Sequence, residues 1–486
     1  MKILFVASEV APFAKTGGLA DVTGSLPLEL KRMGHDVRII IPFYDCIAKG
    51  SFPIRKWRKN VEFTVAGTTH KCLFRQTSLG DIPVYLLGNQ EYFNRDHLYG
   101  TPTGDYPDNH RRFAFFCRGV FQLLQRLDFR PDILHCHDWQ TALVPFLLRF
   151  ELAGVPFFDR TATVFTIHNL AYQGVFPKES LAEMGLDGSS FDIDRLEFYG
   201  KVNLMKGGIL SADIITTVSP TYCAEIQEPA QGCGLDGVLR LRSNDLFGVL
   251  NGLDYTEWDP ATDRRIFRNY TASSPAGKSA NKKWLQLLMG LEEAPDIPLL
   301  GMVTRLTEQK GIDLLIELLP RFADERLQLV ILGTGDERYI RALLSGVAAA
   351  KGKVFFQPDF DPVLASRIYA GSDIFLMPSR YEPCGLGQLI AQRYGSLPVV
   401  RRTGGLADTV CDGKEPTGFC FTEYTADAFR EALARALDAY SQRISWKKLV
   451  RLAMRRDFSW RQSAKHYEEL YGLSLERKGV GAWRKK

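Results

Sequence analysis

Short apolar runs alternate with helical patterns along almost the whole chain. The runs lie at Ile3–Val6, Val37–Ile41, Val84–Leu87, Ile133–His135, Val164–Ile167, Ile214–Val218, Leu299–Val303, Leu327–Leu332, Val354–Gln357, Ile374–Met377 and Leu397–Val400. Strands that alternate with helices pair in parallel and are covered by helices on both faces, so each strand is apolar throughout. The sequence therefore predicts an α/β protein built from doubly wound parallel sheets.

The strand-and-helix pattern restarts at FGVLNG, from Phe247, and divides the 486 residues into two halves of comparable size. A chain of this length holds two or three domains. We predict one Rossmann-like domain over residues 1–246, a second over 247–460, and a helix within 461–486 that packs back on the first. Ligands bind at the carboxyl edge of open α/β sheets, so we expect the two domains to face each other across a deep cleft.

The six letters TGGLAD occur twice, each time after an apolar strand, as Thr16–Asp21 and Thr403–Asp408. The first copy follows Lys15 and precedes a helical pattern over Ala20–Met33. The first N–H groups of a helix have no partner inside the helix, and the helix dipole favours negative charge there. The repeat therefore indicates two similar halves, each with a glycine turn where an anion can bind. A tight connection without a ligand is the alternative.

Composition narrows the class of protein and its partners. The net charge is +5 with Lys and Arg scattered along the chain, which argues against a nucleic-acid partner. No run of 18 or more apolar residues occurs, so we expect no membrane span. Nine cysteines without regular spacing favour a reducing cytoplasm over a disulfide framework. The first glycine turn lacks G-x-G-x-x-G, so a nicotinamide cofactor is not expected, and we predict no cofactor.

Two stretches of the first half depart from the alternation of strands and helices. Between Val61 and Phe74 apolar and polar residues alternate, which indicates a small hairpin. Tyr92–Asn109 is rich in Gly, Pro, Asp and Tyr and is predicted to be a long loop. Tyr99 and Tyr106 in that loop could form a sugar-stacking surface, with ordinary packed aromatics as the alternative.

Polar side chains follow the predicted strands of the first half at their carboxyl ends. Asp138 comes after one strand and His168 and Asn169 after the next, which favours recognition of hydroxyl groups. A histidine satisfied within the core is the alternative for His168. The His-x-His spacing of His135 and His137 resembles a metal site, but no further ligands lie nearby in the sequence, so we predict no metal.

The second half offers cations and a carboxylate in corresponding positions. Arg305 and Lys310 lie on one loop between a strand and a helix. There the rigid guanidinium of Arg305 and the mobile ammonium of Lys310 could together hold a multiply charged anion. Glu382, followed by Pro383 and glycines, suits a hydroxyl or a developing cation better than a phosphate. The alternatives are a solvated loop for the cations and a helix-capping surface carboxylate for Glu382.

These groups together fit one class of substrate. Cations and glycine turns suit a diphosphate, while carboxylates, amides and aromatic rings suit the hydroxyl groups and faces of a sugar. No D-x-D motif stands out as a metal clamp. The combination predicts transfer of a sugar from a nucleotide-diphosphate donor, with protein cations neutralising the leaving group.

Seven motifs, in order and across essentially the whole chain, resemble the bacterial glycogen synthases, close kin of the plant starch synthases. They are KTGGLADV (Lys15–Val22), HDW (His137–Trp139), IHNLAYQG (Ile167–Gly174), NGLD (Asn251–Asp254), TRLTEQKG (Thr304–Gly311), PSRYEPCGL (Pro378–Leu386) and RRTGGLADTV (Arg401–Val410). The resemblance implies two domains of the GT-B type. It also implies metal-independent, retaining transfer of glucose from ADP-glucose to the non-reducing 4-hydroxyl of an α-1,4-glucan such as glycogen.

The resemblance also implies roles for individual residues. The residues implied as catalytic are Glu382 and His168, which flank the donor glucose, and Arg305 and Lys310, which hold the diphosphate. Those implied in substrate binding are Lys15, Gly17, Gly18, Asp21, Tyr99, Asp138, Asn169, Asn251, Phe360, Cys384, Gly385, Leu386, Thr403, Gly404 and Gly405. Among these, Phe360 stands where relatives often have a tyrosine over the adenine, so stacking is expected without a hydroxyl contact.

One departure and two rival functions remain. Many retaining two-domain transferases carry E-x7-E, but Glu382 is followed eight positions later by Ile390, which leaves the ribose-binding carboxylate unassigned. A related transferase that uses UDP-glucose or another acceptor is the first rival. A non-catalytic glucan-binding relative is the second, and intact Lys15, Arg305, Lys310 and Glu382 argue against it.

Overall fold

A computed structural model describes residues 1–56, 61–101, 103–350 and 352–480 of the chain. The chain divides into two units. Unit 1 comprises residues 1–218 and 223–252 together with the chain from Trp460, and unit 2 comprises Ser219–Tyr222 and Leu253–Ser459. Residues 481–486 of the predicted C-terminal segment lie outside the described ranges.

The main sheet of unit 1 is ten-stranded, in the order β15-β14-β10-β9-β1-β2-β6-β5-β3, with β4 paired to β5. Its strands are β1 (Lys2–Val6), β2 (Asp36–Pro42), β3 (Arg55–Lys56), β4 (Val61–Val65), β5 (Thr68–Leu79), β6 (Ile82–Gly88), β9 (Ile133–His137), β10 (Ala162–Ile167), β14 (Ile214–Thr217) and β15 (Leu246–Gly248). The pairs from β15 to β6 are parallel, and β5 pairs antiparallel with β3, β4 and β6.

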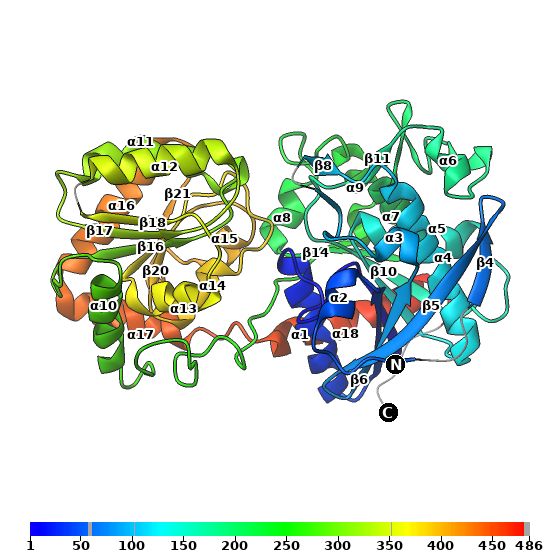
Figure 1. Cartoon of the computed structure of the whole chain (residues 1–486), viewed down its shortest axis with the longest axis horizontal. Coiled ribbons are helices and arrows are strands. Elements are labelled where there is room, and N and C mark those ends of the chain that lie inside the picture. The colour runs from blue at the N-terminus through cyan, green and yellow to red at the C-terminus, as the bar shows by residue number, and fades with distance from the viewer. Residues whose placement is uncertain (57–60, 102, 351, 481–486) are drawn as a thin grey trace. The chain divides into compact units, whose positions relative to one another are not determined.

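Helices cover both faces of this sheet (Figure 1). The longer ones are α1 (Gly18–Arg32), α4 (Asn109–Leu127), α5 (Leu143–Phe150), α7 (Leu204–Ser211) and α18 (Trp460–Arg477). Helix α18 packs on α1 and on β10 and β14, so the end of the chain contributes to the core of unit 1. The shorter helices are α2 (Asp45–Lys49), α3 (Gln90–Phe93), α6 (Ser180–Glu183), α8 (Pro220–Glu225) and α9 (Asp236–Leu241).

Two small antiparallel sheets complete unit 1. One consists of β7 (Gly100–Thr101) and β8 (Gly104–Asp105), within the stretch predicted to be a long loop. The other consists of β11 (Val175–Phe176), β12 (Glu197–Phe198) and β13 (Lys201–Asn203). The hairpin predicted between Val61 and Phe74 is confirmed, because β4 and the first part of β5 pair antiparallel there.

The sheet of unit 2 has six parallel strands in the order β18-β17-β16-β19-β20-β21. They are β16 (Leu299–Val303), β17 (Gln328–Leu332), β18 (Val354–Gln357), β19 (Ile374–Met377), β20 (Leu397–Arg401) and β21 (Phe419–Phe421). Its helices are α10 (Ala276–Leu288), α11 (Ile312–Phe322), α12 (Glu337–Ala349), α13 (Pro362–Gly371), α14 (Gly387–Arg393), α15 (Gly404–Thr409), α16 (Ala426–Ser441) and α17 (Arg443–Arg455). Helices α11 and α12 lie over one face of the sheet and α13 and α14 over the other (Figure 1).

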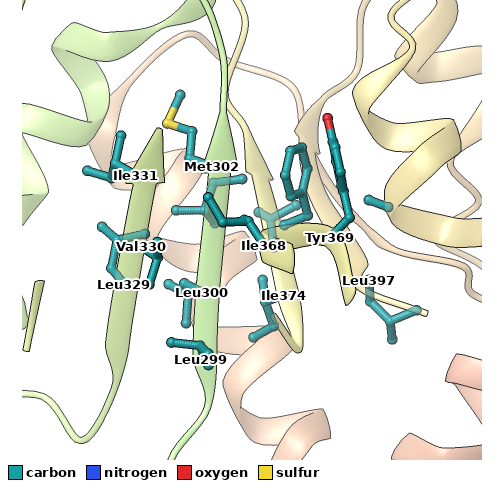
Figure 2. Packing of buried hydrophobic residues seen from close by; sticks show 14 of the residues in the cluster. Leu299, Leu300, Met302, Leu329, Val330, Ile331, Ile368, Tyr369, Ile374 and Leu397 are labelled. Atoms are coloured by element: carbon teal, nitrogen blue, oxygen red, sulfur yellow. The ribbon is translucent and has the colours of Figure 1, made fainter. Parts of the chain in front are cut away.

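The core of unit 2 shows why its strands are apolar throughout. Leu300 lies beside Leu329 on one neighbouring strand and beside Ile374 on the other, and each of the three side chains is fully buried. Ile368 and Tyr369 of α13 pack onto the same strands (Figure 2). A strand covered on both faces has no polar face, so its sequence shows a continuous apolar run. The predicted α/β fold with doubly wound parallel sheets is confirmed.

The unit boundary differs from the pattern-based boundary at Phe247. Strand β15, which contains Phe247, pairs in parallel with β14 and is therefore the edge strand of the first sheet. The chain enters unit 2 at Leu253 and returns to unit 1 at Trp460. In the part of the chain that the structure describes, no helix combines the length and the apolar character that crossing a membrane requires.

Candidate functional site

The glycine turn of unit 1 is organised by Glu9, a buried carboxylate that lies just after β1. The N–H and hydroxyl of Thr16 donate to its two oxygens at 2.5 and 2.6 Å, and the N–H of Gly17 donates at 3.3 Å. Tyr99 donates its hydroxyl to the same carboxylate at 2.7 Å, and the Ser8 hydroxyl lies 2.8 Å from the Tyr99 oxygen. Part of the turn's N–H capacity is thus used by the chain itself, in contrast to the expected free anion site.

The remaining polar groups of this turn are an ion pair. The Lys15 Nζ lies 2.5 Å from Asp21 Oδ1, and the lysine side chain is about half exposed. Lys15 is therefore accessible, but its charge is partly neutralised within the turn. Tyr99 does not offer its hydroxyl to solvent, and its ring lies 6.1 Å from that of Phe113. Its position fits the packed-aromatic alternative, and it supports Glu9.

The carboxyl ends of β9 and β10 bring Asp138 and His168 together. Asp138 follows β9 with a positive φ of 55°, and one of its oxygens accepts the N–H of His168 at 2.8 Å. Burial raises the pKa of the Asp138 carboxyl to about 7, although the N–H groups of His168 and Asn169 oppose that rise. The Asn169 side chain accepts the N–H of Ala171 at 3.1 Å and forms a local turn.

Three buried histidines lie in a row beneath this edge. His135 binds the Tyr471 hydroxyl of α18 through Nδ1 at 2.8 Å and the Thr166 hydroxyl through Nε2 at 2.7 Å. His137 Nδ1 lies 3.0 Å from His168 Nε2. Burial lowers the pKa of His168 to about 3 and lowers the pKa of His135 and His137 well below the ordinary value. All three rings are therefore neutral at pH 7.

No metal site forms from these histidines in the ranges that the structure describes, where no group of three or more His, Cys, Asp and Glu side chains could hold an ion. Both ring nitrogens of His135 already have hydrogen-bond partners. Asn251, the last predicted site residue of unit 1, is buried, and its Oδ1 has no hydrogen-bond partner among the described residues. That amide can accept a hydrogen bond from a ligand without breaking an existing one.

In unit 2, the loops after β16 and β19 meet through an ion pair. Lys310 Nζ lies 2.7 Å from Glu382 Oε2, and Ser379 donates its hydroxyl to the same oxygen at 3.0 Å. The Glu382 side chain is only 6% exposed, so the alternative of a helix-capping surface carboxylate does not describe it. Strands β16 and β19 are neighbours, which is why residues 72 positions apart in the sequence come into contact.

Arg305 differs from Lys310 in having no counter-charge. Its side chain is exposed, and its guanidinium has no hydrogen-bond or ion-pair partner in the described part of the chain. Lys310 retains two N–H donors beyond the one that binds Glu382, since an ammonium carries three. The loop after β16 thus presents the unpaired guanidinium of Arg305 and the Lys310 ammonium with two remaining donors, an arrangement that suits a multiply charged anion.

The second glycine turn is locked against the Glu382 loop. The N–H of Gly405 donates to the carbonyl oxygens of Glu382 and Pro383 at 3.1 and 3.3 Å. A Cβ on Gly404 would lie 2.0 Å from the Glu382 carbonyl oxygen, and a Cβ on Gly405 would lie 2.1 Å from that of Cys384. These glycines are required by the close approach of the chain's own backbone. Thr403 begins this turn and is buried.

The first glycine turn has no such internal requirement. A Cβ on Gly17 or Gly18 would meet no heavy atom within 4 Å, and Gly17 has an extended backbone that any residue adopts. The two TGGLAD turns are therefore alike in sequence and different in packing. Packing within the described part of the chain therefore does not require glycine at positions 17 and 18.

Three further predicted positions of unit 2 are open to a ligand. The N–H groups of Gly385 and Leu386, at the start of α14, have no hydrogen-bond acceptor among the residues described. Phe360, beyond the end of β18, is 66% exposed and can offer a ring face. Cys384, in contrast, is buried, so its contribution is limited to the backbone that supports the Gly404–Gly405 turn.

Sequence reasoning missed two residues that organise these groups. Glu9 was not among the predicted site residues, although a carboxylate shortly after a buried strand is itself a signal of a strand-end site. Ser379 gives no sequence signal, because its contact with Glu382 depends on the conformation of a single loop.

Comparison with known proteins adds a family to this geometry. Residues 2–241 match the family model described as "Starch synthase catalytic domain", and residues 290–452 match "Glycosyl transferases group 1". The glycogen synthase of Geotalea daltonii is 64% identical over 483 residues, which cover 99% of this chain and 100% of the relative. The glycogen synthase of Moorella thermoacetica is 47% identical and covers 98% of this chain and of the relative.

Solved structures give the same picture. The catalytic domain of Starch Synthase IV from Arabidopsis thaliana, bound to ADP and acarbose, superposes with a TM-score of 0.91 at 37% identity and covers 98% of this chain and 99% of that one. Sucrose-phosphate synthase from Thermosynechococcus elongatus is 17% identical with a TM-score of 0.59, a likeness of fold alone.

Proposed function

Because this chain belongs to the glycogen synthase family of glycosyltransferases, we propose that it transfers glucose from ADP-glucose to the 4-hydroxyl at the non-reducing end of an α-1,4-glucan. ADP is the other product. The choice of nucleotide is supported by the related starch synthase catalytic domain, which was solved bound to ADP. The choice of acceptor is supported by the relatives named glycogen synthase, which match this chain over nearly its whole length.

The observation that carries the proposal is the cation pair of unit 2. Arg305 has an unpaired guanidinium, and Lys310 lies on the same loop with donors to spare. In the proposal both bind the diphosphate, with Arg305 as a bidentate fork and Lys310 as a point charge. The free N–H groups of Gly385 and Leu386 bind phosphate oxygens, and Phe360 stacks on the adenine.

Unit 1 supplies the groups for the sugar in this proposal. The open space at Gly17 and Gly18 allows the backbone to approach the donor closely. Asp138, His168 and Asn169 bind sugar hydroxyls at the ends of β9 and β10. The weaker assignments to the sugar or acceptor side are Lys15, Asp21, Tyr99 and Asn251, of which Tyr99 acts through Glu9.

The proposed reaction breaks the bond between the anomeric carbon and the β-phosphate oxygen, and the electron pair leaves with ADP. The acceptor 4-oxygen forms the new bond, and its proton passes to the departing phosphate. Negative charge gathers on ADP, where fixed cations lower the barrier with little reorganisation. In the proposal the Glu382 carboxylate stabilises the positive charge that develops on the sugar, and its ion pair with Lys310 offsets the cost of burying that carboxylate.

Retention is explained in the proposal by attack from the face that the leaving group occupies. The Glu382 carboxylate is held by Lys310 and Ser379, which makes it a poor free nucleophile. Isolation of a glucosyl-enzyme adduct on a carboxylate, after rapid quenching with a slow donor, would contradict this assignment.

The experiment that tests the proposed function measures nucleotide release. ADP-glucose and glycogen are mixed with the protein, UDP-glucose replaces ADP-glucose as the control, and chain growth is followed on a short α-1,4-glucan. We expect ADP release that depends on glycogen, with little UDP release. Preferential release of UDP from UDP-glucose would assign the other donor, equal release of both nucleotides would contradict the choice of ADP-glucose, and binding of glycogen without release of either nucleotide would identify a non-catalytic relative.

A cytoplasmic location completes the proposal. All nine cysteines are present as free thiols in the structure, including the exposed Cys46, Cys233 and Cys411. Free, exposed thiols persist in a reducing compartment.

A further inference from the structure

A single hydrogen bond joins the rings of His137 and His168. Their nitrogens, His137 Nδ1 and His168 Nε2, lie 3.0 Å apart in the buried interior of unit 1. A neutral imidazole has one donor and one acceptor nitrogen, so one ring must donate and the other accept. Burial keeps the pKa of each ring well below its ordinary value, so both rings are neutral at neutral pH and each carries one proton.

The other nitrogen of His137 decides which ring donates. His137 Nε2 is fully buried and has no hydrogen-bond partner among the described residues. If His168 donated, His137 would carry its proton on Nε2, and a buried N–H would remain without an acceptor. If His137 donates through Nδ1, only a lone pair remains unpaired at Nε2. Orphaned N–H groups are the rarer of the two in protein interiors, so the second arrangement is favoured.

The direction of this hydrogen bond fixes the state of His168. When His168 Nε2 accepts, its proton must lie on Nδ1, and Nδ1 has no hydrogen-bond partner in the described part of the chain. We propose that His137 is a positioning residue that holds His168 as the Nδ1–H tautomer, so that His168 donates a hydrogen bond to an oxygen of the transferred sugar. The identity of the sugar rests on the proposed function, but the tautomer does not.

The surroundings of His137 prevent its ring from rotating to reverse the hydrogen bond. Phe5 stacks on one side of it with a centroid distance of 5.6 Å and an interplanar angle of 17°. The His135 ring lies 4.2 Å away, and His135 is fixed by Tyr471 and Thr166. Helix α18 therefore contributes to the orientation of His168 through Tyr471, His135 and His137.

The direct test is the ¹⁵N spectrum of the histidine side chains in the full-length protein labelled with ¹⁵N-histidine. The His168 signals are assigned by their loss in His168→Gln. We expect a protonated Nδ1 and an unprotonated Nε2 at pH 7 without any substrate. A protonated Nε2 on His168 would overturn the proposal whether or not the protein transfers glucose.

The kinetic test compares three variants at position 137. His137→Asn retains an N–H as many bonds from the backbone as Nδ1, whereas His137→Phe retains the ring shape without a donor, and His137→Gln carries its amide one bond further out. We expect His137→Phe and His137→Gln to lower kcat/KM about 10- to 100-fold, or about 1.4–2.7 kcal/mol at 1.36 kcal/mol per factor of ten. His137→Asn should recover most of that loss.

The control is His466→Asn, an exposed position on α18, which should leave kcat/KM unchanged. Thermal unfolding of each variant separates lost positioning from lost folding. If His137→Phe is stable and fully active, or if His137→Asn is as impaired as His137→Phe, the positioning role is refuted. If no variant or wild-type sample releases nucleotide, the proposed function fails, and the ¹⁵N spectrum still decides the tautomer.

Discussion

Alanine substitution at the two glycine turns should separate ligand binding from folding. The perturbation is the same in both turns, one methyl group on each of two adjacent glycines. Gly17→Ala/Gly18→Ala changes the turn of unit 1, and Gly404→Ala/Gly405→Ala changes the turn of unit 2. The sequences TGGLAD around them are identical, so the substitutions are matched in local composition.

In unit 2 the methyl groups collide with the chain's own backbone. The Gly404 and Gly405 Cβ atoms would lie 2.0 and 2.1 Å from carbonyl oxygens, and neither oxygen can swing away as a side chain could. Overpacking of this kind costs about 1–3 kcal/mol, and the left-handed backbone of Gly404, with φ of 42°, adds about 1–2 kcal/mol. For a unit of about 150–250 residues each kcal/mol lowers Tm by about 2–4 °C.

In unit 1 the same substitution is free of internal clashes. Gly17 and Gly18 have no heavy atom within 4 Å of an added Cβ. Replacing glycine at a compatible backbone stabilises a protein by about 0.4–1 kcal/mol, because the unfolded chain loses freedom. A methyl group between this turn and a bound donor costs about 1–3 kcal/mol of transition-state binding, or roughly 5- to 150-fold in kcat/KM.

The assay pairs thermal unfolding with ADP release from ADP-glucose and glycogen. We expect the Gly17→Ala/Gly18→Ala protein to have an unchanged or higher Tm and low activity, and the Gly404→Ala/Gly405→Ala protein to have a clearly lower Tm. Full activity in the stable unit 1 variant would refute the argument that a ligand approaches that turn. A lower Tm in that variant would show that the glycines serve the fold instead.

Three further predictions follow from the same geometry. Arg305→Ala and Lys310→Ala should each lower kcat about 10²–10³-fold in the nucleotide-release assay, and losses below about threefold for both would refute their assignment to the diphosphate. Only Lys310→Ala should also destabilise unit 2, by about 3–5 kcal/mol, because it leaves the buried Glu382 carboxylate without its counter-charge. His168 stays neutral in the folded protein down to about pH 3, whereas the unfolded chain binds its proton below about pH 6.5, so this group should lower stability as pH falls, by about 2 kcal/mol between pH 7 and 5. Asp138, with its pKa raised to about 7, acts in the opposite direction, so the effect is measured as the difference in stability between the protein and His168→Gln. Urea titrations in which that difference is the same at pH 7 and pH 5 would contradict this prediction. Phe360→Ala should weaken ADP binding about 5- to 150-fold through loss of about 1–3 kcal/mol of stacking, without a change in Tm because the ring is exposed, and calorimetric titration with ADP, with Phe360→Tyr as the control, measures it.

Local patterns were enough to predict the architecture because parallel strands buried on both faces are apolar throughout. Strands such as Leu299–Val303 and Ile374–Met377 have the bounds that the pattern predicts. The domain boundary predicted at Phe247 differs from the unit boundary of the structure for a related reason. An edge strand of one sheet and the first strand of the next have the same apolar signature, and only the pairing of β15 with β14 assigns Phe247 to unit 1.

The sequence was enough to predict which residues belong to the candidate site, but not which side chains they contact. Arg305, Lys310 and Glu382 follow apolar strands, so sequence position alone brings them to a strand end. The ion pair between Lys310 and Glu382 depends on β16 lying beside β19, an order that the sequence does not state. For the same reason Glu9 went unrecognised, because its partners come from two separate loops.

The amino-acid sequence by itself determined the secondary structure, the doubly wound class of the fold, the family and the side chains available at each strand end, because these depend on periodicity and residue type near each position. Tertiary structure decided which of those side chains contact one another. The two TGGLAD turns have identical sequences, but the turn at Gly404–Gly405 is closely packed against the chain's own backbone and the turn at Gly17–Gly18 is open. His137, whose spacing from His135 resembles a metal site in the sequence, is hydrogen-bonded to His168 in the structure. Contacts across a sheet depend on strand order, which no local stretch of sequence encodes.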